Sequence, residues 1–193
     1  ALPNLNNDIA KLLKETFDVG EKVNVTFTVN LNLIGTNIDG ETLPTAIRNY
    51  NGEFLGIDVD IRLNPDILNN SSQEYILVTM YHEVVHAFLA YEKGRLGEVE
   101  FNNQYPNLKE VEILYGNREK IKKYQLIQIE GHNLFAPYIG NLSSSLLSFN
   151  SRLSLRDARA LAIMGIVEAK SMSQSEVMIN DNHRKGISGT KCR

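Results

Sequence analysis

Residues 71–91 read SSQEYILVTMYHEVVHAFLAY, and this stretch decides the fold of the chain. Its first four residues, Ser71 to Glu74, form a capping box, which is typical of a helix N-terminus. Neither Gly nor Pro interrupts the stretch, and its apolar residues cover most of the circumference of a helix. The sequence therefore predicts a long helix in the interior, and polar residues in its C-terminal half need a specific partner.

Two strands are predicted before this helix. Residues 22–31 (KVNVTFTVNL) alternate between apolar and polar side chains, as do residues 57–63 (IDVDIRL), which end before Pro65. Such alternation is typical of half-buried strands. Residues 35–53 are rich in turn formers and predict a hairpin or a short extra strand, and residues 6–16 predict a short amphipathic helix.

Helices dominate the prediction for the rest of the chain. Residues 94–110 contain many Gly and Asn and predict a loop. Helices are predicted over about 118–148 and 154–170, and the polar stretch from Ser171 onward is expected to lie across the surface. Together the elements predict one α+β domain over residues 1–193, in which a small twisted, mostly antiparallel sheet packs on the buried helix and a helical half follows.

The composition excludes several classes of protein. Of the 193 residues, 42% are hydrophobic and 22% are charged, so a packed core is expected rather than a disordered chain. The net charge of −3 provides no basic field for a phosphate backbone, so nucleic acid is not an expected partner. No run of about 18 apolar residues is present, and no membrane span is predicted. The single cysteine, Cys192, excludes an intrachain disulfide and a cysteine zinc ribbon.

The sequence leaves the compartment and the oligomeric state open. The chain starts Ala-Leu-Pro without an initiator Met. Either recombinant expression of a chosen segment or cleavage of an export signal would produce such a start. This start and the near absence of cysteine are compatible with export from a bacterial cell, to the periplasm or the outside.

The predicted interior helix contains His82-Glu83-Val84-Val85-His86, an H-E-x-x-H motif. Residues at i and i+4 lie on one helical face, so both imidazoles can reach one tetrahedral zinc ion. Glu83 is the next residue round the helix, where its carboxylate can act as general base on a water that zinc activates. Burying these groups without partners would cost several kcal/mol, which a metal would offset. The motif therefore predicts a zinc site.

A catalytic zinc site needs a third protein ligand. His132 is the preferred candidate, because helical sequence flanks it and a second helix could deliver it to the site. Glu130 is the carboxylate alternative, which would give a site of two His and one Glu. Glu98 and Glu100 are weaker candidates.

Two other residues are poor ligand candidates. Glu92 follows His86 by six residues and therefore lies on a different helical face. His183 lies in a polar tail and is expected to be solvated. The metzincin pattern is also excluded, because it requires Gly and His where this chain has Leu89 and Glu92.

Residues 82–91, HEVVHAFLAY, resemble the motif helix of the zincin metallopeptidases, and more narrowly that of the SprT-like group of small HExxH proteins. An alternating strand precedes the motif, and a later helical segment carries His132 followed by aromatic and small residues up to Tyr138. The resemblance implies a zincin-like fold and a peptidase site with zinc as the cofactor. The Cys-rich ribbon that some members carry is absent.

The implied site consists of His82, His86 and His132 as zinc ligands and Glu83 as the catalytic residue. Glu83 would take a proton from the activated water and return it to the leaving amine. The oxyanion of the reaction needs a further hydrogen-bond donor, for which Tyr138 is preferred. The other candidates for this donor are Tyr105, Tyr91 and His183.

A peptide or protein is the predicted substrate. In zincins an edge strand above the metal holds an extended substrate by backbone pairing, and residues 57–63 have the matching place in the sequence; the alternative is a purely structural strand. Three rival functions stay open. They are a non-catalytic binding module stabilised by a four-ligand zinc, a zinc amidase acting on a non-protein substrate such as a cell-wall component, and an interaction domain with a vestigial, metal-free motif.

Overall fold

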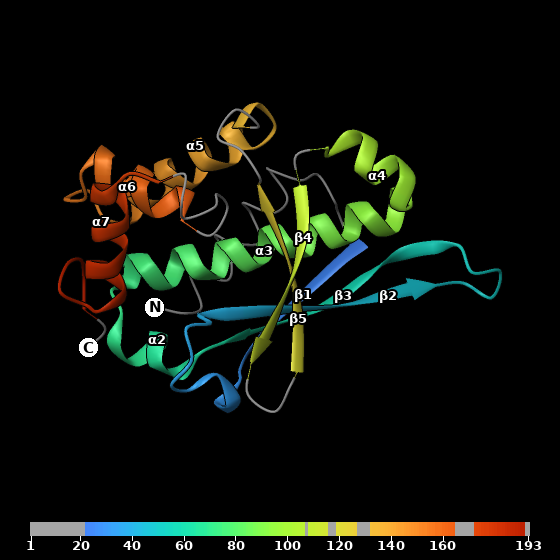
Figure 1. Cartoon of the computed structure of the whole chain (residues 1–193), viewed down its shortest axis with the longest axis horizontal. Coiled ribbons are helices and arrows are strands. Elements are labelled where there is room, and N and C mark those ends of the chain that lie inside the picture. The colour runs from blue at the N-terminus through green and yellow to red at the C-terminus, as the bar shows by residue number, and fades with distance from the viewer. Residues whose placement is uncertain (1–21, 107, 116–118, 127–131, 165–171, 192–193) are drawn as a thin grey trace.

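The computed structural model describes residues 22–106, 108–115, 119–126, 132–164 and 172–191. For residues 113–115, 119–126 and 132–138 it describes the backbone without the side chains. The short helix predicted at residues 6–16 lies outside the described residues. The described elements form a mixed α and β fold with a small sheet and several helices (Figure 1).

A long helix, α3 (Gln73–Leu96), runs through the middle of the molecule (Figure 1). Its N-cap is Ser72 rather than Ser71, so the predicted capping box of Ser71 and Glu74 does not form. The side chain of Ser72 accepts a hydrogen bond from the amide of Tyr75, and the carboxylate of Glu74 binds Thr190 instead. Nearly every residue from Glu74 to Glu92 is buried, the polar ones included. These observations confirm the predicted interior helix.

Helical structure continues farther than the sequence predicted. α3 passes through Gly94 and stops before Gly97, whose φ is 78°, and α4 (Glu98–Gln104) follows directly. The loop predicted over residues 94–110 is therefore wrong for most of its length. Gly94 serves helix packing rather than a loop, because the ring of Phe54 occupies the place that a Cβ atom would need.

A three-stranded sheet packs against α3 in the order β1 (Val23–Val29), β3 (Phe54–Leu63), β2 (Gly40–Arg48). Both strands predicted from alternation are confirmed, and β2 is the extra strand expected within residues 35–53. β3 pairs in parallel with β1 and antiparallel with β2. Pro44 in β2 suits an edge position, since proline has no amide hydrogen to donate to a further strand.

The central place of β3 corrects one prediction about residues 57–63. β1 pairs along one side of this strand and β2 along the other. A strand that is paired on both sides has its backbone groups already in use. Residues 57–63 are therefore not the edge strand that was expected to hold a substrate, and among the described strands of this sheet the edges are β1 and β2.

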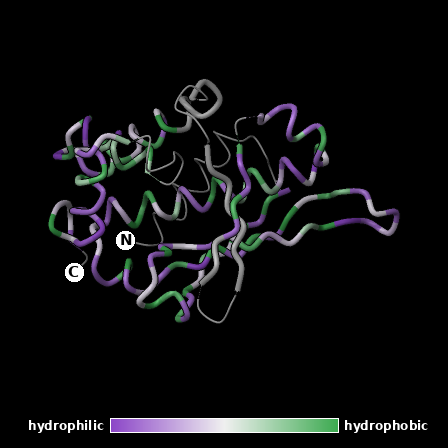
Figure 2. Tube along the Cα trace, viewed as in Figure 1, coloured by the Kyte–Doolittle hydropathy of each residue, from purple (hydrophilic) through white to green (hydrophobic). Residues whose placement is uncertain are grey.

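The apolar core lies between this sheet and α3. The α3-facing residues of β3, from Ile57 to Leu63, are at most 5% exposed, and each fully buried side chain of this size stabilises the fold by about 1.5–3 kcal/mol. The same cluster continues into α4 through Phe101 and into the C-terminal helices. In contrast, the turn between β2 and β3 is hydrophilic and projects from the body of the molecule (Figure 2).

Two short helices connect the strands to the rest of the fold. η2 (Leu31–Leu33) follows β1, and α2 (Pro65–Asn70) joins β3 to α3. Asn64 caps α2, and its buried amide donates to the carbonyl oxygens of Leu33 and Ile38 at 2.7 and 2.9 Å. This amide ties the two connections together.

The chain after α4 differs from prediction at its start. A hairpin of β4 (Leu108–Tyr115) and β5 (Glu119–Leu126) stands where the sequence predicted a loop and then a helix from about residue 118. The register pairs Leu108 with Leu126 at the open end of the hairpin and Tyr115 with Glu119 at its turn. The predicted helix is wrong over this hairpin, and its helical part is α5 (His132–Phe149).

Two further helices follow, α6 (Leu155–Ile163), which packs on α5, and α7 (Gln174–Arg184), which packs on α6, and both contact α3 near its N-terminal end (Figure 1). The predicted helix from residue 154 is confirmed as far as Ile163, and residues 165–171 lie outside the described part. The described part of the polar tail is mostly exposed or half-buried, as predicted, but it contains the helix α7, in which Asn180 and His183 are buried. Across the described residues, none of the helices combines the length and the apolar character needed to cross a bilayer.

Candidate metal centre

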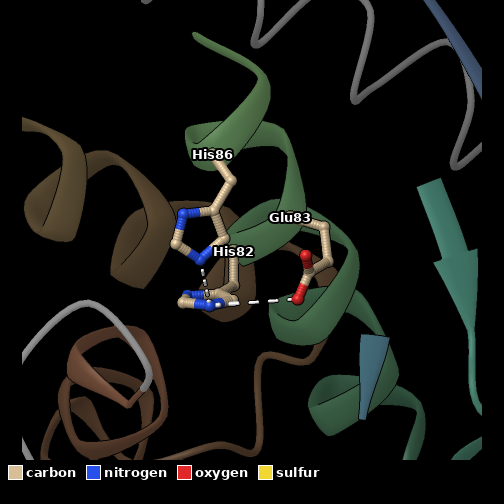
Figure 3. Close-up of side chains that lie close together, drawn as sticks. All are labelled: His82, Glu83 and His86. Carbon is tan, nitrogen blue, oxygen red and sulfur yellow. Dashed lines mark hydrogen bonds and ion pairs between the residues drawn. The ribbon is translucent and has the colours of Figure 1, made fainter. Parts of the chain in front are cut away.

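Two imidazole rings of α3 meet on one face of the helix. The Nε2 atoms of His82 and His86, one helical turn apart, are separated by 2.8 Å. The ring centroids lie 4.4 Å apart at an interplanar angle of 88°. Figure 3 shows both rings turned toward one another. The side chain of His82 keeps 13% of its surface exposed, so solvent reaches the pair from this side.

Glu83 places a carboxylate beside the imidazole pair (Figure 3). Its side chain is only 1% exposed, and its Oε1 atom lies 3.9 Å from Nε2 of His82. The other oxygen, Oε2, lies 2.8 Å from the hydroxyl oxygen of Thr42 on β2. The sheet therefore holds one carboxylate oxygen, while the second faces the histidines.

These three side chains form a donor set that fits zinc. One ligand atom from each of His82, Glu83 and His86 lies within 4.8 Å of the others. Imidazole nitrogen and carboxylate oxygen are donors that zinc binds in proteins. The two Nε2 atoms share a hydrogen bond at 2.8 Å in this structure, and each would offer a lone pair to zinc once its imidazole is neutral with the hydrogen on Nδ1. The predicted pair of ligands and the predicted base are thus brought together by one turn of α3.

The predicted third ligand lies on another element. His132 is the first residue of α5, but its side chain is outside the described residues. Glu130, the carboxylate alternative, is likewise outside them. Whether either reaches the histidines therefore stays a prediction.

The other acidic candidates have different surroundings. Glu92 is buried and bound to Arg95, with its two carboxylate oxygens 2.9 and 2.7 Å from the guanidinium nitrogens. This pairing agrees with the expectation that Glu92 is a poor ligand. Glu98 and Glu100 lie exposed in the first turn of α4 and are not part of the described metal-ligating group.

His183 corrects the expectation of a solvated tail residue. It is 3% exposed in α7, and its Nδ1 atom lies 2.8 Å from the hydroxyl oxygen of Ser72. Burial lowers the pKa of this imidazole, although the nearby carboxylates of Glu74 and Asp157 oppose the shift. Ser72 precedes His82 by ten residues, about 15 Å along the helix, so His183 stabilises the far end of α3 and is not an oxyanion donor at this site.

The tyrosines that were considered as oxyanion donors are only partly described. Tyr91 packs its ring against Phe54 at 5.6 Å, and the hydroxyl of Tyr105 donates to Glu92 at 3.3 Å. Both contacts lie toward the C-terminal end of α3, beyond the motif. The side chain of Tyr138, the preferred donor, is outside the described residues, so its role stays a prediction.

The sequence reasoning missed the contribution of β2 to the site. Thr42 contacts Glu83, and a Cβ atom at Gly40 would lie 3.0 Å from Cγ of the same glutamate. Both residues belong to a turn-rich stretch in which no motif marks them. The only available signal was the small size of Gly40, which is common in turns as well.

Comparisons with protein-family models, with curated proteins and with solved structures found no match for this chain. The resemblance of residues 82–91 to the zincin and SprT-like peptidases therefore stays a prediction, based on the motif itself.

Proposed function

We propose that this chain is a zinc-dependent peptidase with a zincin-like arrangement of its motif helix. In this proposal His82 and His86 bind zinc, His132 completes the site, and Glu83 is the general base. The observation that carries the proposal is the convergence of two imidazole Nε2 atoms, 2.8 Å apart, beside a buried carboxylate.

The chemistry divides between the metal and the protein. A bound zinc ion would supply a Lewis acid that lowers the pKa of a water molecule to about 7 and polarises the substrate carbonyl. Oε1 of Glu83, which faces His82, would take the proton of the attacking water and pass it to the leaving nitrogen. Tyr138 would donate a hydrogen bond to the oxyanion.

A peptide substrate is supported by the place of β2. This strand is an edge of the sheet. Its residues Gly40 to Thr42, which lie beside Glu83, are buried, and its exposed part runs from Pro44 to Arg48. An exposed edge can pair with an extended peptide through backbone hydrogen bonds. The strand beside the site is thus β2, in place of the strand that the sequence suggested.

Replacing the proposed base tests the enzymatic role. Glu83→Gln should keep zinc but lose hydrolysis of a library of quenched fluorescent peptides by at least about 100-fold, because general-base catalysis contributes about 10²–10⁴. Glu53→Gln is the matched control, since Glu53 lies exposed in the β2–β3 turn. It should behave as the native chain does.

The outcome also separates the rival functions. Equal hydrolysis by the native chain and Glu83→Gln would contradict the proposal. Bound zinc without turnover of any amide would indicate a zinc-stabilised binding module. Hydrolysis of non-peptide amides alone would indicate an amidase.

A further inference from the structure

We propose that Thr42 is a positioning residue whose hydroxyl holds the Glu83 carboxylate against β2, so that Oε1 is the oxygen directed at the histidines. This inference rests on the proposed function and goes beyond it by assigning part of the site to the sheet. The motif alone contains no information about this strand.

The contact is buried and close. Thr42 is 7% exposed, and its hydroxyl oxygen lies 2.8 Å from Oε2 of Glu83 and 2.8 Å from the main-chain oxygen of the same residue. A threonine hydroxyl thus meets both the side chain and the backbone of one helical residue. The hydroxyl carries one hydrogen, so it donates to one of these two oxygens at a time, and the bond to Oε2 is the one that orients the carboxylate.

Gly40 supplies the space for the same carboxylate. It lies two residues before Thr42 and so faces the same side of β2. A Cβ atom at Gly40 would lie 3.0 Å from Cγ, 3.3 Å from Cδ and 3.3 Å from Oε1 of Glu83. A larger residue would therefore press directly on the base.

The intervening residue has a different role, which argues that the contact is specific. Glu41 is buried and faces the other side of β2. It accepts a hydrogen bond from Asn30 at 2.6 Å and lies 3.9 Å from a guanidinium nitrogen of Arg62. The alternation of the strand thus directs Gly40 and Thr42 alone of these three residues toward Glu83.

Three variants of the zinc-loaded full chain test the positioning role. Thr42→Val removes the hydroxyl with little change in shape, Thr42→Ser keeps it, and Thr45→Val changes an exposed threonine of the same strand as the matched control. We expect Thr42→Val to lower kcat for the quenched peptides by about 10- to 100-fold with an unchanged KM, because a misplaced catalytic group costs up to about this factor. Thr42→Ser should restore kcat to within about threefold, and zinc content should not change in any variant.

Other kinetic results would overturn the positioning role. A native kcat in Thr42→Val would overturn it, because a purely structural contact affects stability rather than kcat. An equal loss of kcat in Thr42→Val and Thr42→Ser would also overturn it, because the serine keeps the hydroxyl.

A double-mutant cycle tests the contact independently of turnover. Thr42→Val, Glu83→Met and the double variant are unfolded with urea in the presence of a chelator. If Thr42 holds Glu83, the losses of stability are less than additive, and additive losses overturn the inference. If the zinc-loaded native chain hydrolyses no peptide, the proposed function fails, and this cycle alone decides whether Thr42 holds Glu83.

Discussion

The buried polar residues of α3 differ in what they contact, and this difference locates the candidate site. Glu74 accepts hydrogen bonds from Thr190 on the C-terminal segment, and Glu92 is paired with Arg95. Glu74 thus links α3 to the C-terminal segment, and Glu92 forms an ion pair within α3. His82 and His86 instead direct ring nitrogens at each other, a contact that brings two metal-binding atoms together. At the residue scale the histidine pair is therefore the feature of α3 that indicates chemistry.

Gly189 provides a test of how tightly the C-terminal segment closes over α3. Its φ is 85°, and a Cβ atom there would lie 2.5 Å from Oε2 of Glu74 and 2.7 Å from Nδ1 of His183. Gly189→Ala should therefore cost about 1–2 kcal/mol for the left-handed backbone and a further ~1–3 kcal/mol for overpacking. Urea unfolding measures this loss.

Gly35→Ala is the matched control for that prediction. Gly35 has a similar φ of 74°, but a Cβ atom there would meet nothing within 4 Å. Its substitution should cost the backbone strain alone. Equal losses in the two variants would show that the segment around Gly189 is not packed as described.

At the scale of elements, α3 is anchored at its N-terminal end by segments that are distant in the sequence. The hydroxyl of Ser72 meets His183 of α7, and the hydroxyl of Tyr75 donates to Asp39 at 2.7 Å. Arg184 of α7 binds the same aspartate at 2.9 and 3.0 Å. These contacts fix the start of the helix, while its middle carries the candidate metal site.

The anchoring of α7 predicts a pH-dependent stability. Because burial lowers the pKa of His183 in the fold, the unfolded chain binds its proton at a higher pH than the folded chain does. The free energy of unfolding should therefore fall as the pH drops through 6.5, the ordinary value, and should keep falling until the lowered pKa is passed. The urea concentration at the midpoint of unfolding, measured between pH 7.5 and pH 5 with chelator present, should fall with this loss of stability.

His183→Gln isolates that contribution, because it removes this imidazole and leaves every other ionisable group in place. The variant should lose less stability than the native chain over the same pH range. Parallel pH profiles for the two would contradict the assignment. Glu74 should reduce the stability of both chains at still lower pH. Burial raises the pKa of this carboxyl, but hydrogen bonds from Thr190 and Asn150 outweigh the burial and lower the pKa overall. The stability that Glu74 contributes is therefore retained above pH 4.5 and is lost as the pH falls through the lowered pKa.

The packing of β3 on α3 gives a further prediction. A Cβ atom at Gly94 would clash with the ring of Phe54, whereas one at Gly140 of α5 would meet nothing within 4 Å. Gly94→Ala should destabilise the fold by roughly 1–3 kcal/mol, and Gly140→Ala should stabilise it by up to about 1 kcal/mol, because alanine favours the helix. Thermal unfolding of both variants checks the signs, and a stabilised Gly94→Ala would contradict the described packing.

The elements that could be predicted from the sequence are those with a strong periodic pattern. α3 and the strands β1 and β3 carried such patterns, and the candidate site lay within α3 as a motif. The strand β5 was missed because Ile121 and Tyr124 recur at helical spacing, whereas the segment becomes a strand by pairing with β4. The helical structure of residues 94–104 was missed because a glycine such as Gly94 usually indicates a helix end. Here Gly94 lies within α3, where the ring of Phe54 leaves no room for a side chain. His183 and Thr42 were missed because only tertiary structure brings them to their partners.

At the scale of the whole molecule, one apolar core joins β3, α3, α4, α5 and α6. The proposed zinc site would add a second link between α3 and α5 if His132 supplies the third ligand. The molecule would then combine a rigid helix that carries two ligands, a sheet edge that holds the base, and a later helix that closes the site.

Zinc content per chain tests the central claim most directly. Inductively coupled plasma mass spectrometry on protein purified without chelator should find about one zinc ion per native chain. The His82→Ala/His86→Ala double variant should hold less than about 0.1 zinc ion per chain, and His132→Ala should hold much less than the native chain. His183→Gln, which removes an imidazole away from the site, should keep about one. Full zinc in His132→Ala would remove that residue as a ligand and favour Glu130. No zinc in the native chain after zinc is added back, or full zinc in the double variant, would contradict the account.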